Sequence, residues 1–221
     1  MEQTVLRNSF YIQISVTDEQ KQYARQLVEY SLKNHQVANI WDHHNDRLPQ
    51  TRMLRYTGTL GEIVFADLYH LPRPLKSFGA VDGQDWGQDF LIKSENDTFS
   101  VDIKSMKRRS GNLAADFVLN IPAHQLRKTG SKTSHYFCIS FHQSETQGTI
   151  ASLIGFMDKQ ALETGEIGQL YKAGTKRIRH DQTSFTFYED TYEILLKDID
   201  SPVVTDHIRS AAGYRVCYLT A

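Results

Sequence analysis

Hydrophobic residues recur at helical spacing in two parts of the chain. Thr17 or Asp18 can cap a helix that carries apolar residues on one face, so a helix is predicted over about 17–35. Its apolar residues are Tyr23, Leu27, Val28 and Leu32. Residues 37–56 show no such period and are predicted to be irregular. A short, well-buried helix is predicted from Leu60 to a point before Pro72, because Leu60, Val64 and Leu68 share one face.

The rest of the chain is dominated by strand-like patterns. DFLIK (89–93) and TFSVDIKS (98–105) alternate apolar and polar residues around a polar Ser94–Asp97 turn, which predicts a hairpin. Further strands are expected at 136–141, 150–156, 185–188, 192–196 and 214–219, and helices near 122–128 and 158–165. This order predicts an α/β or α+β fold with a mixed central β-sheet flanked by helices. We expect one domain over 1–221, with a core at about 57–157, an N-terminal helical segment at about 17–35 and a β-rich C-terminal extension at about 158–221.

Composition narrows the class of protein. With 40% hydrophobic and 23% charged residues, the chain is expected to be globular and not disordered. It has no apolar run of about 20 residues and no secretory signal pattern. Cys138 and Cys217 both lie in apolar runs, so buried thiols and a cytoplasmic location are expected.

The charge distribution argues against a protein that coats nucleic acid nonspecifically, because the net charge is −1. Two local basic clusters remain, and either could be a solvated face or a DNA contact. The first contains Lys104, Lys107, Arg108 and Arg109, and the second contains Lys172, Lys176, Arg177 and Arg179.

The hairpin pattern fixes a register. If Phe90 faces Val101 and Ile92 faces Phe99, one side is apolar throughout, and a slip of one residue would break the match. The opposite side then sets Asp89 across from Asp102. Lys104, two residues farther along, points the same way.

This arrangement predicts a divalent metal site. Like charges that face each other across two strands are destabilising, and a cation between the carboxylates would remove that cost. Mg²⁺ suits a few carboxylate oxygens completed by water and phosphate, and Mn²⁺ is expected to substitute for it. The Lys104 ammonium would stabilise charge that develops on a phosphate undergoing attack.

These residues resemble the PD-(D/E)xK nuclease superfamily, which has the restriction-endonuclease-like fold. The resemblance rests on Asp89 in DFLI, on VDIKS after it and on Gly61-Glu62 in an upstream helix, and it covers about residues 57–157. It implies Glu62, Asp89 and Asp102 as metal-site acids and Lys104 as the catalytic lysine. The residue before Asp89 is Gln88, where the family pattern has Pro.

The resemblance implies a metal-dependent DNA endonuclease of restriction or DNA-processing type, with a homodimer expected only by analogy. Lys107, Arg108 and Arg109 would contact DNA, and Gln125 and Ser105 are candidate auxiliary residues. The alternative is a nucleic-acid-binding or assembly subunit that keeps the fold but does not cut.

For several single residues, a purely structural role is the alternative to a functional one. Glu62 could be a solvated helix residue, Asp102 and Lys104 an ordinary strand face, and Asp82 or Asp85 could replace Asp89. His43-His44 invites a zinc interpretation, but adjacent histidines point in different directions and no HxxxH or CxxC partner supports them.

Overall fold

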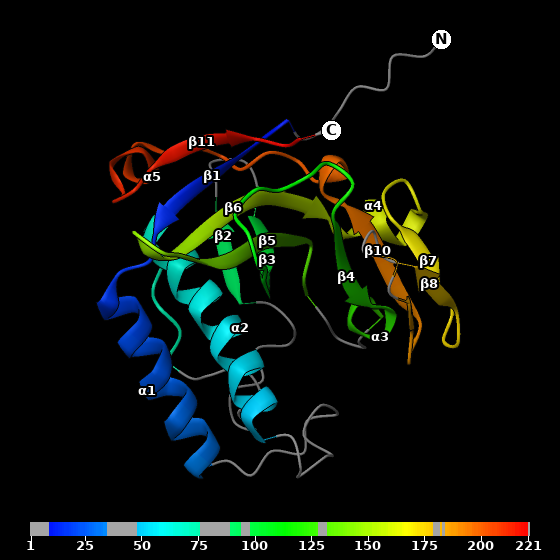
Figure 1. The fold of residues 1–221 in the computed structure, drawn as a ribbon, viewed down its shortest axis with the longest axis horizontal. Helices are drawn as coiled ribbons and strands as arrows, with labels where there is room; N and C mark the ends of the chain where they lie inside the picture. The colour runs from blue at the N-terminus through cyan, green and yellow to red at the C-terminus, as the bar shows by residue number, and fades with distance from the viewer. Residues whose placement is uncertain are drawn as a thin grey trace.

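A six-stranded mixed sheet forms the centre of the molecule, in the order β11-β1-β6-β5-β3-β2 (Figure 1). The computed structural model describes residues 9–34, 48–75, 89–93, 98–127, 132–178, 182 and 184–220. Only β3 and β5 run parallel in this sheet, and the other described neighbours are antiparallel. The strands are β1 (Phe10–Ser15), β2 (Phe90–Lys93), β3 (Thr98–Lys107), β5 (His135–Ser144), β6 (Gly148–Asp158) and β11 (Arg215–Tyr218).

Two smaller sheets and several helices complete the fold. One sheet has the order β4-β10-β7, and β8 pairs with β9. These strands are β4 (Val118–Pro122), β7 (Gln169–Tyr171), β8 (Lys176–Ile178), β9 (Ser184–Thr186) and β10 (Thr191–Leu195). The helices are α1 (Asp18–Asn34), α2 (Leu48–Leu68), α3 (Ala123–Leu126), α4 (Lys159–Thr164), α5 (Asp206–Ser210) and the 3₁₀ helix η4 (Leu196–Asp198).

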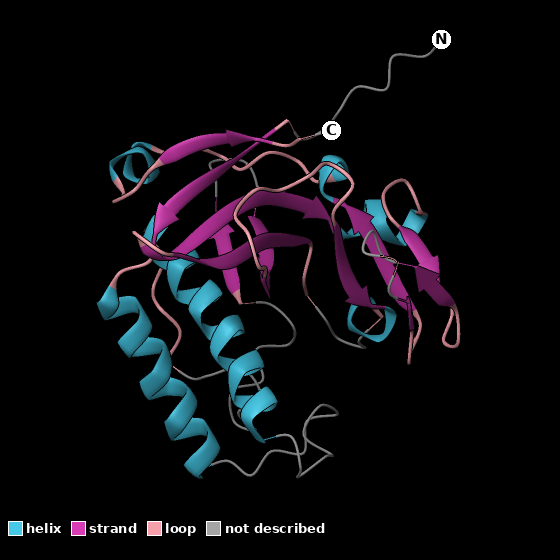
Figure 2. Ribbon diagram, viewed as in Figure 1, coloured by secondary structure: helices cyan, strands magenta, loops and turns pink. Residues whose placement is uncertain are grey.

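The central sheet separates two hydrophobic cores. Helices α1 and α2 lie on one face of the sheet (Figure 2). There Phe65 of α2 contacts both Phe90 and Phe137. The second core joins the other face to β4, β10, α3 and α4, and it contains Tyr136 and Cys138. The fold is therefore mixed, as the sequence predicts, with a mixed central sheet and helices beside it.

The predicted hairpin register is confirmed. Phe90 pairs with Val101 and Ile92 pairs with Phe99. Phe90, Val101 and Ile103 are buried in the first core, where Ile92 and Phe99 are partly buried against them. The period-2 pattern determined this register because it places Phe90, Ile92, Phe99 and Val101 on the core side, and a slip of one residue would turn them outward.

The start of α1 is also as predicted, and Thr17 is its cap. The Thr17 hydroxyl accepts a hydrogen bond from the Gln20 amide, while the Gln20 side chain accepts one from the Thr17 amide. This reciprocal pair satisfies amides that the first helical turn leaves without partners.

The prediction for the next segment is wrong, because α2 begins at Leu48 and the irregular region predicted over 37–56 therefore overlaps it. Gly58, a residue of low helix propensity, lies within this helix. The added length is held by α1, since Arg52 pairs with Glu29 and Arg55 donates to Ser31. Packing of this kind outweighs the low helix propensity of one glycine.

Four strands of the described part of the chain were not predicted: β1, β4, β7 and β8. β1 lies between β11 and β6 in the central sheet, and β4 pairs with β10. Segments from both ends of the chain thus contribute strands to the central sheet, outside the 57–157 core expected from the resemblance.

No helix of the described residues is long and apolar enough to cross a membrane.

The two thiols differ. Cys138 is fully buried, and burial raises the pKa of its thiol to about 12. Cys217 is only partly covered, so the expectation of two buried thiols holds for one of them.

Candidate functional site

The site is built on the part of β3 that continues beyond its pairing with β2. The described ladder between these strands ends at the Phe90–Val101 pair, whereas β3 runs on to Lys107. On its other side β3 stays paired with β5, with Asp102 beside Tyr136. Since side chains alternate along a strand, Asp102 and Lys104 lie on the face opposite buried Val101 and Ile103.

Lys104 is the centre of a polar cluster on this face. Its Nζ lies 2.8 Å from Asp102 Oδ1 and donates to Gln125 Oε1 at 2.9 Å. It also sits 5.2 Å from the centroid of the Tyr136 ring. The side chains of Lys104 and Asp102 are 18% and 19% exposed, so this ion pair is screened less than a surface pair. Of the predicted residues, the structure therefore brings Asp102, Lys104 and Gln125 together.

Asp89 reaches the same stretch of β3 through the backbone. Its Oδ2 accepts a hydrogen bond from the Ile103 amide at 2.6 Å, and its own amide donates to the Val101 carbonyl at 2.9 Å. Asp89 is thus bound to the residues on both sides of Asp102. The Asp89 and Asp102 carboxylates each have a partner within the protein, the Ile103 amide and the Lys104 ammonium, and their shared role at a metal stays a prediction.

Tyr136 is a member of the site that sequence reasoning missed. It is buried beside Asp102, and burial raises the pKa of its hydroxyl, with a further rise from the negative charge of Asp102 and Glu163. Only the parallel register of β3 and β5 places it there, and no local sequence pattern reveals that pairing.

Glu62 approaches from the other side of β3. Its neighbour Gly61 packs so closely on β3 that a Cβ there would overlap the Ser105 hydroxyl. Glu62 is itself buried, at 9% exposure. Within the described part of the chain, no three His, Cys, Asp or Glu residues gather to hold a metal ion. A role for Glu62 as third metal ligand remains a prediction from the resemblance.

Ser105 does not fit the auxiliary role predicted for it. Its hydroxyl is buried under Gly61 and has no hydrogen-bond partner among the described residues. It lies on the opposite face from Lys104, because the two are adjacent in a strand. A phosphate held near Lys104 would not reach it.

The residues of the first basic cluster differ in their exposure to solvent. Lys107 and Arg109 are exposed at the end of β3. Arg108 instead turns inward, where it donates to the Val118 carbonyl at 2.9 Å and lies 5.1 Å from the Phe117 ring centroid. Burial lowers the pKa of its guanidinium. Arg108 therefore packs against Phe117 in the folded chain, and its contact with DNA stays a prediction.

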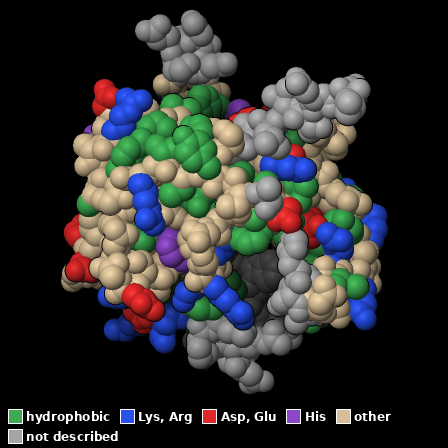
Figure 3. All heavy atoms as spheres, turned by 45° about the horizontal axis from the view of Figure 1, so that its top comes forward, with side chains coloured by type: hydrophobic (Ala, Val, Ile, Leu, Met, Phe, Trp, Pro, Cys, Tyr) green, Lys and Arg blue, Asp and Glu red, His purple; other side chains and the backbone are tan. Residues whose placement is uncertain are grey.

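Two residues of the second basic cluster are paired with acids. Lys172 lies 2.8 Å from Asp190, and Arg177 lies 2.5 Å from Glu193. The face drawn in Figure 3 likewise carries basic and acidic side chains intermixed, without one continuous basic surface. Arg179, His43, His44, Asp82 and Asp85 lie outside the described residues.

The two carboxylates beside Lys104 are of the ligand type that Mg²⁺ uses. Asp89 and Asp102 supply hard carboxylate oxygens, and Mg²⁺ commonly uses one or two carboxylates with water and phosphate as its remaining ligands. The ion would have to compete with the Lys104 ammonium for Asp102.

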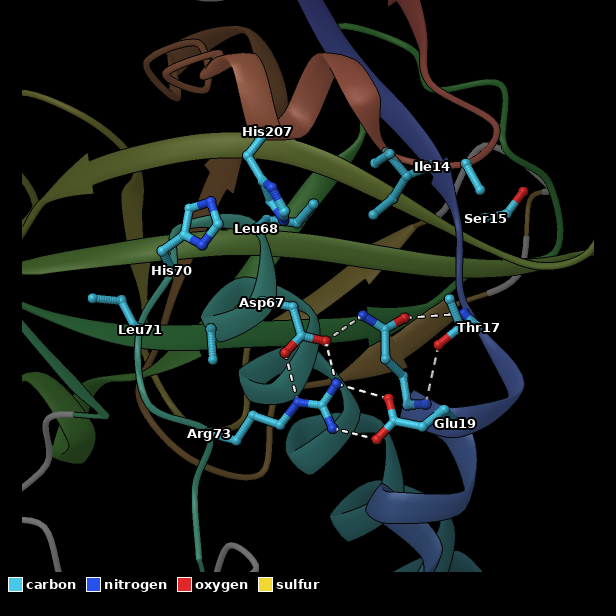
Figure 4. Close-up of a pocket in the computed structure, with 14 residues that line it drawn as sticks. Ile14, Ser15, Thr17, Glu19, Asp67, Leu68, His70, Leu71, Arg73 and His207 are labelled. Carbon is cyan, nitrogen blue, oxygen red and sulfur yellow. Dashed lines mark hydrogen bonds and ion pairs between the residues drawn. The ribbon is translucent and has the colours of Figure 1, made fainter.

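A cavity of about 560 Å³ lies away from these residues, between the ends of β1, α1, α2 and α5 (Figure 4). Arg73 bridges Glu19 and Asp67 across it with N–O distances of 2.5–2.7 Å. This ion pairing lowers the pKa of Glu19. Because the network ties α1 to the segment after α2, we assign it a structural role.

Comparison with protein-family models, curated protein sequences and solved structures gives no match.

Proposed function

We propose that the chain is a metal-dependent DNA endonuclease that hydrolyses phosphodiester bonds, with its site on β3. The observation that carries the proposal is the Lys104 ammonium, which contacts both Asp102 and Gln125. Beside it, the Asp89 carboxylate accepts a hydrogen bond from the Ile103 amide. A structural role needs neither the second carboxylate nor the amide acceptor at this position.

The residues have separable roles in the proposed reaction. Asp89 and Asp102 would hold Mg²⁺, or Mn²⁺ in its place, which supplies Lewis-acid polarisation of the scissile phosphate when bound. An ammonium has three N–H donors, and two of those of Lys104 are directed to Asp102 and Gln125. The third can donate to a phosphate oxygen and stabilise the negative charge that grows during attack. Gln125 positions Lys104, because it fixes the ammonium from α3.

A restriction-endonuclease-like core is part of the proposal. It is supported by the hairpin, the parallel β3–β5 pair and the helix α2 that packs on β3 through Gly61. DNA is the proposed partner, through Lys107 and Arg109 at the end of the same strand.

A second candidate is a nucleic-acid-binding subunit that keeps this architecture but does not cut. It is favoured by the ion pair that occupies Asp102 and by the absence, among the residues that the structure describes, of a three-ligand metal cluster. In that case Lys104 would neutralise Asp102 permanently and no metal would bind.

Incubation of the full chain with supercoiled, linear and branched DNA separates the two candidates. Cleavage in Mg²⁺ or Mn²⁺ that stops with chelator or in the Asp89→Asn variant supports the nuclease. DNA binding without cleavage in any of these metals, with wild-type protein at excess over DNA, would support the binding subunit.

A further inference from the structure

Tyr188 is a fully exposed aromatic residue, with a relative exposure of 101%. It lies in the turn between β9 and β10, a segment from Phe187 to Asp190 that we term the Tyr188 turn. A whole tyrosine ring held in water has a hydrophobic cost that packing usually removes. A ligand that covers the ring would remove this cost.

The Tyr188 turn is firmly held on both sides of the exposed ring. Before it, Phe187 is buried, stacks on Tyr171 at 5.4 Å and exchanges backbone hydrogen bonds with Gly174 and Thr175. After it, Asp190 accepts hydrogen bonds from the Ala173 amide and from Lys172. The backbone on both sides of the ring is therefore held in place, so little backbone entropy remains to be lost when a ligand covers the ring.

The same turn is attached to the helix that carries Gln125. The Ala123 amide donates to the Asp190 carbonyl at 2.7 Å, and His124 lies 2.5 Å from Glu189. His124 is the residue before Gln125, which binds Lys104. The exposed ring is thus connected through α3 to the candidate active site, on the side of the molecule where β10 and β7 lie in Figure 1.

Three cations lie close to the residues on either side of Tyr188, with Lys172 and Arg127 near Asp190 and Lys176 opposite Thr186. Lys172 is 68% exposed on its side chain while it pairs with Asp190. Arg127, exposed at the end of α3, is close enough to help lower the pKa of Asp190, after the larger effects of Lys172 and the Ala173 amide. Lys176 is exposed at the start of β8. An aromatic platform flanked by cations is the combination that binds single-stranded nucleic acid: bases stack on the ring and phosphates pair with the cations.

We propose that Tyr188 stacks an unpaired base of single-stranded DNA and that Arg127 and Lys172 bind the adjoining phosphates. The inference rests on the proposed nuclease function for its choice of DNA and deepens it. The substrate would then be DNA with a single-stranded segment beside the cleavage site, such as a flap, a gap or a frayed end, rather than a continuous duplex.

Equilibrium binding to the full chain tests the proposal without any need for cleavage. Fluorescently labelled single-stranded and blunt duplex oligonucleotides are titrated in Ca²⁺, with fluorescence anisotropy as the signal. Tyr188→Ala should weaken single-strand binding by about 5- to 150-fold, the range found when a stacking aromatic is removed. Tyr188→Phe should keep most of the affinity, because stacking uses the ring and not the hydroxyl. Duplex binding should change little in either variant.

Tyr218 offers a matched control, since it is 70% exposed on the edge strand β11, far in the sheet order from β3. Tyr218→Ala should leave single-strand affinity unchanged. An equal loss in the Tyr188 and Tyr218 variants, an unchanged affinity in Tyr188→Ala, or tighter binding of RNA of the same sequence would overturn the proposal. Failure of the proposed nuclease function is distinguishable from failure of this inference. If the chain does not cut DNA but Tyr188→Ala still weakens single-strand binding, the nuclease proposal fails and the stacking role of Tyr188 is supported.

Discussion

The Asp102–Lys104 ion pair gives a stability prediction whose sign differs from the one that sequence suggests. Repulsion between facing carboxylates predicts that removal of Asp102 is neutral or stabilising in metal-free protein. The structure instead places Asp102 2.8 Å from Lys104, with both side chains under one-fifth exposed. The isosteric Asp102→Asn variant keeps the shape and removes the charge, so it should destabilise the metal-free protein.

The magnitude follows from the burial of the pair. At 2.8 Å and an effective dielectric constant of about 20, the gross attraction is roughly 6 kcal/mol, most of which is offset by lost hydration. Exposed pairs contribute about 0–1 kcal/mol and broken buried pairs cost about 3–5 kcal/mol, so this half-buried pair should lie between them, at about 1–2 kcal/mol. For a chain of this length, that corresponds to a melting temperature lower by about 2–8 °C.

Urea unfolding in chelator measures this change, and a double-mutant cycle with Lys104→Met isolates the pair from its neighbours. We expect a coupling energy of about 1 kcal/mol between the two positions. An Asp102→Asn variant as stable as wild type or more stable would refute the reasoning, since the carboxylate repulsion would then outweigh the ion pair.

Three further predictions follow from other parts of the structure. Gly61→Ala should lower the free energy of unfolding by about 1–3 kcal/mol in urea, because the new Cβ would overlap the Ser105 side chain of β3. Gly58→Ala is the control: a Cβ there meets open space, so the free energy of unfolding should rise by up to about 1 kcal/mol. Burial lowers the pKa of His142 in the folded protein, so His142 binds its proton at a higher pH in the unfolded chain than in the folded one. The free energy of unfolding should therefore fall as the pH drops below about 6.5. In unfolding measured as a function of pH, His142→Gln should flatten that slope. Lys107→Ala and Arg109→Ala should each reduce the salt slope of duplex binding by about 0.9, and unchanged slopes would make both residues ordinary solvated cations.

The hairpin was predictable from sequence because its information is local. Alternation alone placed Phe90 opposite Val101, and from that register Asp89, Asp102 and Lys104 followed. The cap at Thr17 was predictable for the same reason, since its partner is Gln20 in the same turn.

The contacts made by Gln125 and Tyr136 depend on long-range pairing. Gln125 meets Lys104 only because β4 and α3 lie in the connection between two parallel strands, and a parallel pair carries no local turn signal. The inward turn of Arg108 is similar, because Phe117 and Val118 become its neighbours only in the folded chain.

The most direct test of the proposed active site is single-turnover cleavage by wild type and Lys104→Ala, with DNA binding measured in Ca²⁺ alongside. Removal of one preorganised electrostatic contact costs about 10²–10³ in rate, so Lys104→Ala should cut at least about 100-fold more slowly while it still binds DNA. Lys104→Arg should rescue poorly, because a planar guanidinium does not match the position of an ammonium between Asp102 and Gln125. Cleavage by Lys104→Ala at nearly the wild-type rate would contradict the account and remove β3 as the active site.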